Sequence, residues 1–247
     1  MTDRPLILET GVGPVGLVLS EADQGGGGGA LLLHGGGTRS GNNGLWARLA
    51  RTLARSGVSA LRLDYPGRGE SLLAHPGQRA AVKAAGEALG WLRERTEAGG
   101  VAIVGNCGGA RLAIRLAADG QAEGLALVRP YLRRVPPVGA VARPLWKWSI
   151  RVQRHLGWSR VRRAALDPSL FRDLRTALGS TSTMVLVGER DPWARDAALI
   201  RQLNDAVEIQ IVPGLALHGF PTAAAQQETV DRLVSWAQRR AVALRSP

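Results

Sequence analysis

The single cysteine of this chain lies in the motif that most constrains its fold. Residues 105–109 read Gly-Asn-Cys-Gly-Gly and directly follow the apolar run Val101-Ala102-Ile103-Val104. A G-x-C-x-G motif after a buried strand is typical of a nucleophile elbow, a strained turn from strand into helix that presents its central residue at the edge of a sheet. Gly105 and Gly109 supply the positions without bulk that such a turn needs. We therefore expect Cys107 to be a nucleophile, although a free cysteine is more often a small buried side chain.

The pattern of apolar runs predicts an α/β fold. Short apolar runs without strict alternation are separated by longer segments with helical spacing, which is typical of a parallel sheet covered by helices on both faces. We expect an opening hairpin followed by a mostly parallel, doubly wound sheet. The expected strands are residues 6–9, 15–20, 30–33, 58–63, 101–104, 125–128, 184–187 and 207–212, and the expected helices are residues 45–56, 79–96, 194–203, 223–243 and one after the elbow.

Residues 129–182 interrupt this alternation. The segment contains five prolines and no convincing strand, so we expect a helical insertion between two core strands. In such sheets ligands bind at the carboxyl ends of the strands, where an insertion becomes a lid over the nucleophile. The predicted organisation is one domain, with a core of residues 1–128 and 183–247 and a lid of residues 129–182.

A set of motifs, in their order along the chain, resembles the α/β-hydrolase superfamily. His34 and three glycines follow one strand, an Asp-Tyr-Pro-Gly-Arg-Gly-Glu-Ser loop (residues 64–71) follows the next, and the elbow, Asp191 and His218 come later. Within the superfamily, the cysteine elbow and the 64–71 loop look most like the cysteine-nucleophile hydrolases associated with bacterial exosortase systems and, more loosely, like dienelactone hydrolases. Cysteine-triad thioesterases and cyclases share the elbow. The resemblance implies the α/β-hydrolase fold and a triad in the order nucleophile, acid, histidine.

His218 is the expected base of that triad and Asp191 the expected acid. His218 lies in a short loop between the last strand and the last helix, where the superfamily places its base, whereas the other three histidines lie before a glycine run, in a turn and in the 129–182 segment. Asp191 follows the strand at 184–187 and would fix the imidazole tautomer of the base. Capping of the next helix is the alternative role of Asp191. Glu189 is the alternative acid.

Two backbone N–H groups are expected to bind the oxyanion of an acyl-transfer reaction. Gly108 follows the nucleophile, and Gly36 lies in the loop after the first core strand, with Gly37 as its alternative. The place of Cys107 at a helix N-terminus favours the thiolate. Neither a metal nor a cofactor is predicted, because the glycine run at 25–29 lacks the lysine and Ser/Thr of a phosphate-binding loop.

Most of the formal net charge of +12 comes from the predicted lid. Between Gly124 and Leu166 the chain has ten basic residues and no acidic one, and four of them form one stripe at helical spacing: Arg143, Lys147, Arg151 and Arg154. We expect this stripe to bind an acidic partner or a phosphate-bearing substrate. The alternatives are a solvated face and peripheral contact with an anionic membrane surface. Nucleic acid is not an expected partner, because stacking aromatic residues along a groove are missing.

A sulfur nucleophile suits thioester chemistry. We expect an acyl-transfer enzyme with a Cys-His-Asp triad that takes an acyl group from a thioester, on coenzyme A or an acidic acyl carrier protein, and acts as a thioesterase, acyltransferase or cyclase. One alternative is a dienelactone-type or carboxylester hydrolase of a free small molecule, and another is a binding protein without catalysis. The single cysteine excludes an intrachain disulfide and no secretory or membrane-spanning stretch is present, so a cytoplasmic protein is expected.

Overall fold

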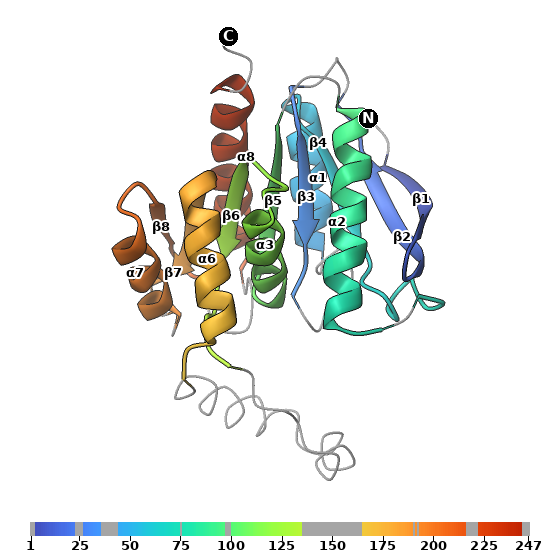
Figure 1. Ribbon diagram of the computed structural model, residues 1–247. Helices are drawn as coiled ribbons and strands as arrows, with labels where there is room; N and C mark the ends of the chain where they lie inside the picture. Colours follow the sequence, from blue (N-terminus) through green and yellow to red (C-terminus); the bar gives the residue numbers. More distant parts are fainter. Residues whose placement is uncertain are drawn as a thin grey trace, which may run out of the picture.

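An eight-stranded sheet forms the centre of the protein (Figure 1). The computed structural model describes residues 3–22, 27–35, 44–74, 76–96, 100–134, 165–189, 191, 193–215 and 222–243, without the side chains of 240–243. The strand order is β1-β2-β4-β3-β5-β6-β7-β8; β2 pairs antiparallel with β1 and β4, and the remaining pairs are parallel. The strands are β1 (Asp3–Thr10), β2 (Gly13–Ser20), β3 (Gly29–Leu33), β4 (Ser59–Leu63), β5 (Val101–Asn106), β6 (Gly124–Val128), β7 (Ser182–Gly188) and β8 (Glu208–Val212).

The alternation of side chains along the central strands divides the core into two layers. In β3, Leu31 and Leu33 belong to one apolar cluster, while Ala30 and Leu32 belong to the other. The parallel strands β5, β6 and β7 alternate in the same way, because successive side chains of a strand point to opposite faces. Both faces are therefore buried, which explains why the sequence of these strands is apolar without a gap. The mostly parallel, doubly wound α/β-hydrolase fold expected from the sequence is confirmed.

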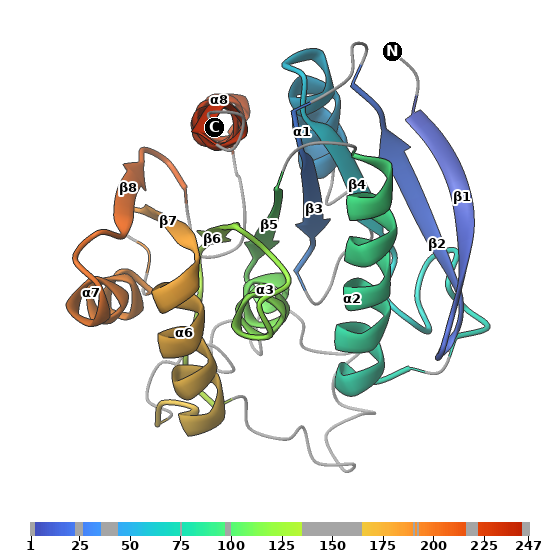
Figure 2. The ribbon, with the colours of Figure 1, turned by 45° about the horizontal axis from the view of Figure 1, so that its top comes forward.

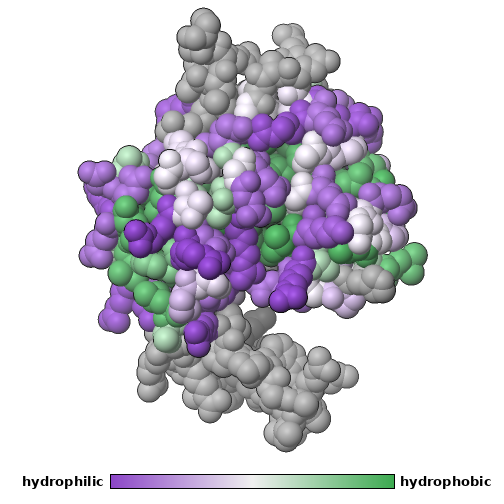
Figure 3. Space-filling model, in the orientation of Figure 1, coloured by the Kyte–Doolittle hydropathy of each residue, from purple (hydrophilic) through white to green (hydrophobic). Residues whose placement is uncertain are grey.

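Helices cover both faces of the sheet (Figures 1 and 2). The side chains of α1 (Leu45–Arg55) and α8 (Ala223–Ala243) pack in one cluster, and those of α2 (Gln78–Arg95), α3 (Gly108–Ala118), α6 (Pro168–Ser180) and α7 (Ala194–Leu203) pack in the other. The face with α2, α3 and α6 is mostly hydrophilic at its surface (Figure 3), as expected for amphipathic helices that cover a sheet. The predicted bounds of the helices at 194–203 and 223–243 are confirmed at both ends.

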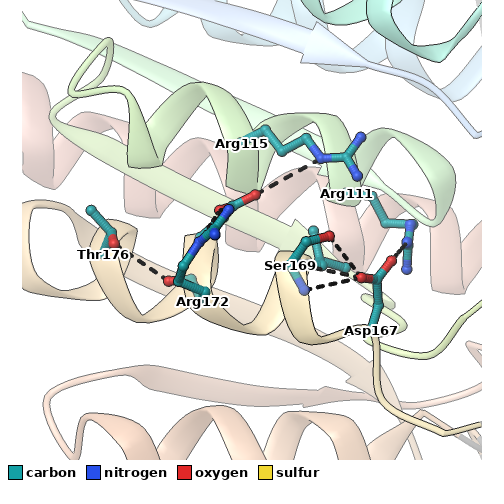
Figure 4. A network of polar contacts seen from close by, with 8 residues as sticks. Arg111, Arg115, Asp167, Ser169, Arg172 and Thr176 are labelled. Carbon is teal, nitrogen blue, oxygen red and sulfur yellow. Dashed lines mark hydrogen bonds and ion pairs between the residues drawn. The ribbon is translucent and has the colours of Figure 1, made fainter.

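Helix α6 lies inside the segment that the sequence assigned to the insertion, yet it covers the sheet. Asp167 caps its first turn by accepting hydrogen bonds from Ser169 and Leu170, and Pro168 occupies the first turn. Four side chains of α6 are buried in the core: Leu170, Leu174, Ala177 and Leu178. Ion pairs join α6 to α3, with Arg111 on Asp167 at 2.5 Å and Arg115 on Asp173 at 4.0 Å (Figure 4). This part of the 129–182 segment therefore belongs with the core.

The remaining part of that segment, residues 135–164, lies outside the described residues. Its two flanks lie side by side: Arg133 and Leu166 form an isolated β-bridge, and the N–H of Arg134 donates to the carbonyl oxygen of Ala165 at 2.9 Å. The N–H of Asp167 donates to the carbonyl oxygen of Leu132 at 2.7 Å. The division of the chain into a core and a lid stays a prediction, and these flanks place its boundaries nearer to residues 134 and 165.

The direction in which the chain crosses the sheet reverses between β3 and β5. After β3 the chain moves outward to β4, then returns past β3 to β5 and continues to β8 on the other side. The carboxyl ends of these strands are level, since Leu33 pairs with Gly105 and Asn106 with Val128. Such a reversal opens a crevice at the carboxyl ends of the strands, where open α/β sheets bind their ligands. Cys107 follows β5 at this point.

We predict that Gly109→Ala destabilises the protein strongly. A Cβ at Gly109 would overlap the backbone carbonyl of Leu33 and come within 2.7 Å of the carbonyl oxygen of His34. Overpacking against backbone that cannot move aside should lower the free energy of unfolding by about 2–3 kcal/mol, measured by urea denaturation. The control is Gly90→Ala in α2, where nothing lies within 4 Å of the added carbon and a gain of up to about 1 kcal/mol is expected. Equal effects in the two variants would contradict the close approach of α3 to β3.

Candidate active site

Cys107 has the strained backbone expected of a nucleophile elbow. Its φ of 53° and ψ of −110° lie outside the helical and extended regions, and α3 begins at the next residue, Gly108. A Cβ at Gly105 would lie 2.6 Å from the carbonyl oxygen of Gly109 and 2.7 Å from the Cα of Ala110. The strand, turn and helix predicted from the motif are therefore present, and the glycine positions are required by contact. Strain of this kind costs about 1–3 kcal/mol and is typical of functional sites.

The loop after β3 forms one wall beside Cys107. His34 is fully buried, its Nδ1 lies 2.8 Å from the carbonyl oxygen of Gly35, and its ring stacks on Tyr65 at 4.0 Å between centroids. The Tyr65 hydroxyl donates to the carbonyl oxygen of His34 at 2.7 Å. Burial lowers the pKa of His34, so its ring is neutral at pH 7. His34 thus shapes the loop that leads toward the expected oxyanion donor.

The loop after β4 is held by hydrogen bonds to its own residues and to β2. The Ser71 hydroxyl donates to the carbonyl oxygen of Asp64 at 2.8 Å and accepts from the N–H of Gly16 at 2.9 Å. The carboxylate of Asp64 accepts from the N–H of Glu70 at 3.2 Å. These contacts give Asp64 and Ser71 a structural role, while Tyr65 between them contacts His34.

Burial raises the pKa of the Cys107 thiol. The charge of Arg129 and a hydrogen bond from the backbone of Gly108 act in the opposite direction, whereas the charge of Asp191 adds to the increase. The hydrogen bond from Gly108 at the helix N-terminus favours the thiolate, as expected from the sequence, but the larger effect of burial leaves the pKa above its ordinary value. A thiol in this state is protonated at neutral pH and needs a base before it can attack.

Asp191 is buried beside the first turn of α7. Its Oδ1 accepts from the N–H of Trp193 at 3.0 Å, its carbonyl oxygen accepts from the N–H of Ala194 at 3.0 Å, and its Oδ2 accepts from Nε of Arg129 at 2.7 Å. The N-cap of α7 is Trp193 and no side chain caps this helix, so the Asp191 side chain holds the turn before α7 and does not have the alternative capping role. Its contacts leave the expected role as acid open, because each carboxylate oxygen has two lone pairs. Glu189, the alternative acid, is exposed.

The structure brings part of the predicted site together. Cys107 and Gly108 follow β5, and Asp191 follows β7, at the carboxyl ends of strands separated only by β6. His218 and Gly36 lie outside the described residues, as do the four residues of the basic stripe, Arg143, Lys147, Arg151 and Arg154. Their predicted roles stay predictions.

Two buried arginines near Cys107 were not singled out in the sequence. Arg129 follows β6 and contacts Asp191, while Arg111 in α3 donates to the carbonyl oxygens of Tyr131 and Arg133 and to Asp167. Arg129 is counted in the sequence among the ten basic residues between 124 and 166, which hides it in a run of like charges. Its place directly after a buried apolar strand is the signal that separates it from the others.

Other kinds of site are not found in the described part of the chain. No group of three or more His, Cys, Asp or Glu side chains there is arranged to hold a metal ion. Among the same residues, no helix combines the length and the apolar character that crossing a bilayer requires. An open groove of about 690 Å³ lies between α2 and the second half of α3, lined by residues that include Lys83, Glu87 and Arg115. Cys107 stands at the opposite end of α3, so this groove is separate from the elbow.

Comparisons with known proteins agree with the fold. A family model described as the Alpha/beta hydrolase family matches residues 30–246. The chain is similar to a thermostable carboxyl esterase from Bacillus coagulans, with a TM-score of 0.73, 13% identity, and coverage of 98% of this chain and 99% of that one. It is also similar to brefeldin A esterase, described as a bacterial homologue of human hormone-sensitive lipase (TM-score 0.70, 20% identity, coverage 98% and 77%).

A third similar structure is an alpha-beta serine hydrolase homologue from Coxiella burnetii, with a TM-score of 0.64, 18% identity, and coverage of 95% of this chain and 97% of that one. At these identities the likeness concerns the fold. Comparison with curated protein sequences finds no match.

We predict that alkylation of Cys107 follows a raised pKa. Iodoacetamide reacts with the thiolate, so the rate should rise with pH and reach its midpoint above the value of about 8.5 for a free cysteine. Mass spectrometry of the intact protein, sampled over time from pH 6 to 10, measures the rate, and the same protein unfolded in urea gives the unperturbed midpoint. A midpoint below that of the unfolded chain would show that the helix N-terminus and Arg129 outweigh burial.

Proposed function

This chain belongs to the alpha/beta hydrolase family, and we propose that it hydrolyses carboxylic esters of small molecules through an acyl intermediate on Cys107. The observation that carries the proposal is the left-handed backbone of Cys107, which stands between β5 and α3 where the crossing direction of the chain reverses. The esterases among the similar folds support an ester as the substrate class. The substrate's acyl group would lie at the carboxyl ends of β3 and β5.

The proposed reaction has two acyl-transfer steps. His218 takes the proton of the Cys107 thiol while the sulfur attacks the ester carbonyl, and the tetrahedral oxyanion is bound by the N–H groups of Gly108 and Gly36. The C–O bond to the alcohol breaks, and the alcohol leaves with the proton from His218. Water then attacks the acyl-cysteine thioester with His218 as base, which releases the acid and returns the thiol. Asp191 orients the imidazole and stabilises its charged form.

The raised pKa of the Cys107 thiol supports a mechanism with a base in the same step. A nucleophile that is protonated at rest behaves like the hydroxyl of a serine hydrolase, which also depends on its histidine for each attack. The resemblance to the cysteine-nucleophile hydrolases of exosortase systems, and more loosely to dienelactone hydrolases, rests on the cysteine elbow together with the loop at residues 64–71. We propose that this chain belongs to that cysteine branch of the family.

We predict that Cys107→Ala abolishes hydrolysis of p-nitrophenyl acetate and the acetyl mass shift of the intact protein. His218→Ala should lower turnover on the order of 10³-fold or more, about as much as loss of the nucleophile. The double variant should be little worse than either single variant, because the two groups act as a unit. Cys107→Ser should fold but turn over more slowly, since a hydroxyl is the weaker nucleophile. Full turnover in Cys107→Ser, or additive losses in the double variant, would contradict the mechanism.

A second candidate function is acyl transfer from a thioester, as a thioesterase, acyltransferase or cyclase. It is favoured by the sulfur itself, because attack on a thioester exchanges one thioester for another at little free-energy cost. The basic stripe in the sequence would then dock an acidic acyl carrier protein or the phosphates of coenzyme A. Comparing kcat/KM for aryl esters with that for acyl-pantetheine thioesters separates the two candidates.

If the stripe docks an acidic carrier, we predict that the double variant Arg143→Glu and Arg151→Glu raises KM for a carrier-bound acyl substrate. Turnover of a short acyl-pantetheine thioester should stay nearly unchanged, because that ligand carries no acidic protein surface. The effect should weaken with salt as the Debye length falls from ~10 Å at 0.1 M to ~3 Å at 1 M. Co-sedimentation with anionic liposomes that the same variant loses would favour a membrane surface instead, and no change in either assay would make the stripe a solvated face.

A further inference from the structure

A buried ion pair joins the strand next to the elbow to the expected acid. The Nε of Arg129 lies 2.7 Å from Oδ2 of Asp191, and the exposed fractions of the two side chains are 6% and 0%. Two charges out of contact with water cost several kcal/mol each to desolvate, and they persist only where each compensates the other. The pair is therefore a unit, and removal of either member takes away a charge that compensates the other.

The backbone of Arg129 has a positive φ, a conformation that is unfavourable for a residue with a side chain. Of the residues that the structure describes, only Cys107 and Arg129 have a positive φ without being glycine, at 53° and 52°. The left-handed region is unfavourable for a residue with a side chain, whereas glycine adopts it freely. An arginine at this position indicates a role for the guanidinium.

Cys107 and Arg129 directly follow two neighbouring strands, β5 and β6, and backbone hydrogen bonds connect them to the ends of the adjacent strands. The N–H of Cys107 donates to the carbonyl oxygen of Val128 at 3.0 Å, and the N–H of Arg129 donates to the carbonyl oxygen of Leu186 at 2.8 Å. Because Val128 directly precedes Arg129, the hydrogen bond from Cys107 connects the elbow to the residue next to the arginine. The geometry therefore fixes Arg129 between the nucleophile and the acid.

Asp191 is fixed from two sides by this arrangement. Arg129 donates to one carboxylate oxygen, and the backbone N–H of Trp193 donates to the other. Among the described residues, the charged and titratable groups that act on the Cys107 thiol are Arg129, Asp191, Arg111, Tyr65 and Tyr131. The charges of Arg129 and Asp191 move the pKa of the thiol in opposite directions.

We propose that Arg129 is a positioning residue that sets the carboxylate of Asp191 and balances its negative charge beside Cys107. The inference rests on the proposed roles of Cys107 and Asp191, and it adds a fourth member to the expected triad. The alternative is that the pair is a structural link between the segments after β6 and β7. Arg133 and Asp196, which lie four residues after Arg129 and five after Asp191, form such a link at 3.1 Å.

The test compares alkylation of Cys107 by iodoacetamide, from pH 6 to 10, in four variants. In Arg129→Gln the uncompensated carboxylate should move the midpoint to higher pH and slow alkylation at pH 7.5 by about threefold to tenfold, where tenfold corresponds to one pKa unit. In Asp191→Asn the loss of the negative charge beside the thiol should move the midpoint to lower pH by a similar factor. The double variant should lie near the wild type, and Arg129→Lys should restore most of the rate. Opposite shifts that cancel are not expected of a merely structural link.

Arg133→Gln is the matched control, because it breaks the neighbouring Arg–Asp pair. It should lower the free energy of unfolding without moving the alkylation midpoint. If Arg129→Gln only destabilises the protein and leaves the midpoint in place, the proposal is overturned. If one of the two single variants fails to fold, the other decides, because a midpoint that stays in place in that variant overturns the proposal. Alkylation needs no turnover, so a chain in which Cys107 proves unnecessary for hydrolysis would refute the proposed function and leave this test intact.

Discussion

The contact between α3 and the end of β3 is the constraint on which the rest of the site depends. Gly109 lies against the carbonyl groups of Leu33 and His34, and Gly105 lies against Ala110. A side chain at either of these two positions would push α3 away from the sheet. Cys107 would then be displaced from its position at the carboxyl ends of the strands. Because the strands are level, this one contact also sets where the nucleophile stands relative to the groups that follow β6 and β7.

Three ion pairs between arginine and aspartate side chains connect segments of this strongly basic chain. Arg129 with Asp191, Arg133 with Asp196 and Arg111 with Asp167 each join two segments that are distant in the sequence. Buried pairs of this kind add little net stability relative to apolar side chains, but they disfavour arrangements that separate the partners. They therefore specify how the segments after β6 and β7 and the helices α3 and α6 meet, while the excess positive charge of the chain lies elsewhere.

Much of the fold could be predicted from the sequence because its signals are local. The apolar strands, the helix at 194–203 and the G-x-C-x-G elbow each depend on residues close together in the chain. Helix α6 was assigned to the insertion because prolines dominate the flanking sequence, although Asp167-Pro168 is a helix start. The burial that raises the pKa of the Cys107 thiol and the partner of Arg129 could not be predicted in the same way. The first depends on the packing of the whole fold, and the second on a carboxylate more than sixty residues away, which no local pattern reports.

The narrow base formed by residues 131–134 and 165–167 has a consequence for how such a chain can diversify. The segment between these flanks leaves and re-enters the core at adjacent backbone groups. Because its two ends are already close together, it does not need a particular length to join them. Loop-closure entropy changes only slowly with loop length, so insertions and deletions at such a base are tolerated. Arg111 and Asp196 hold the two sides of the base from within the core. The base therefore sets no limit on the length of the segment between residues 134 and 165, and the sheet and its helices can stay the same while that segment changes.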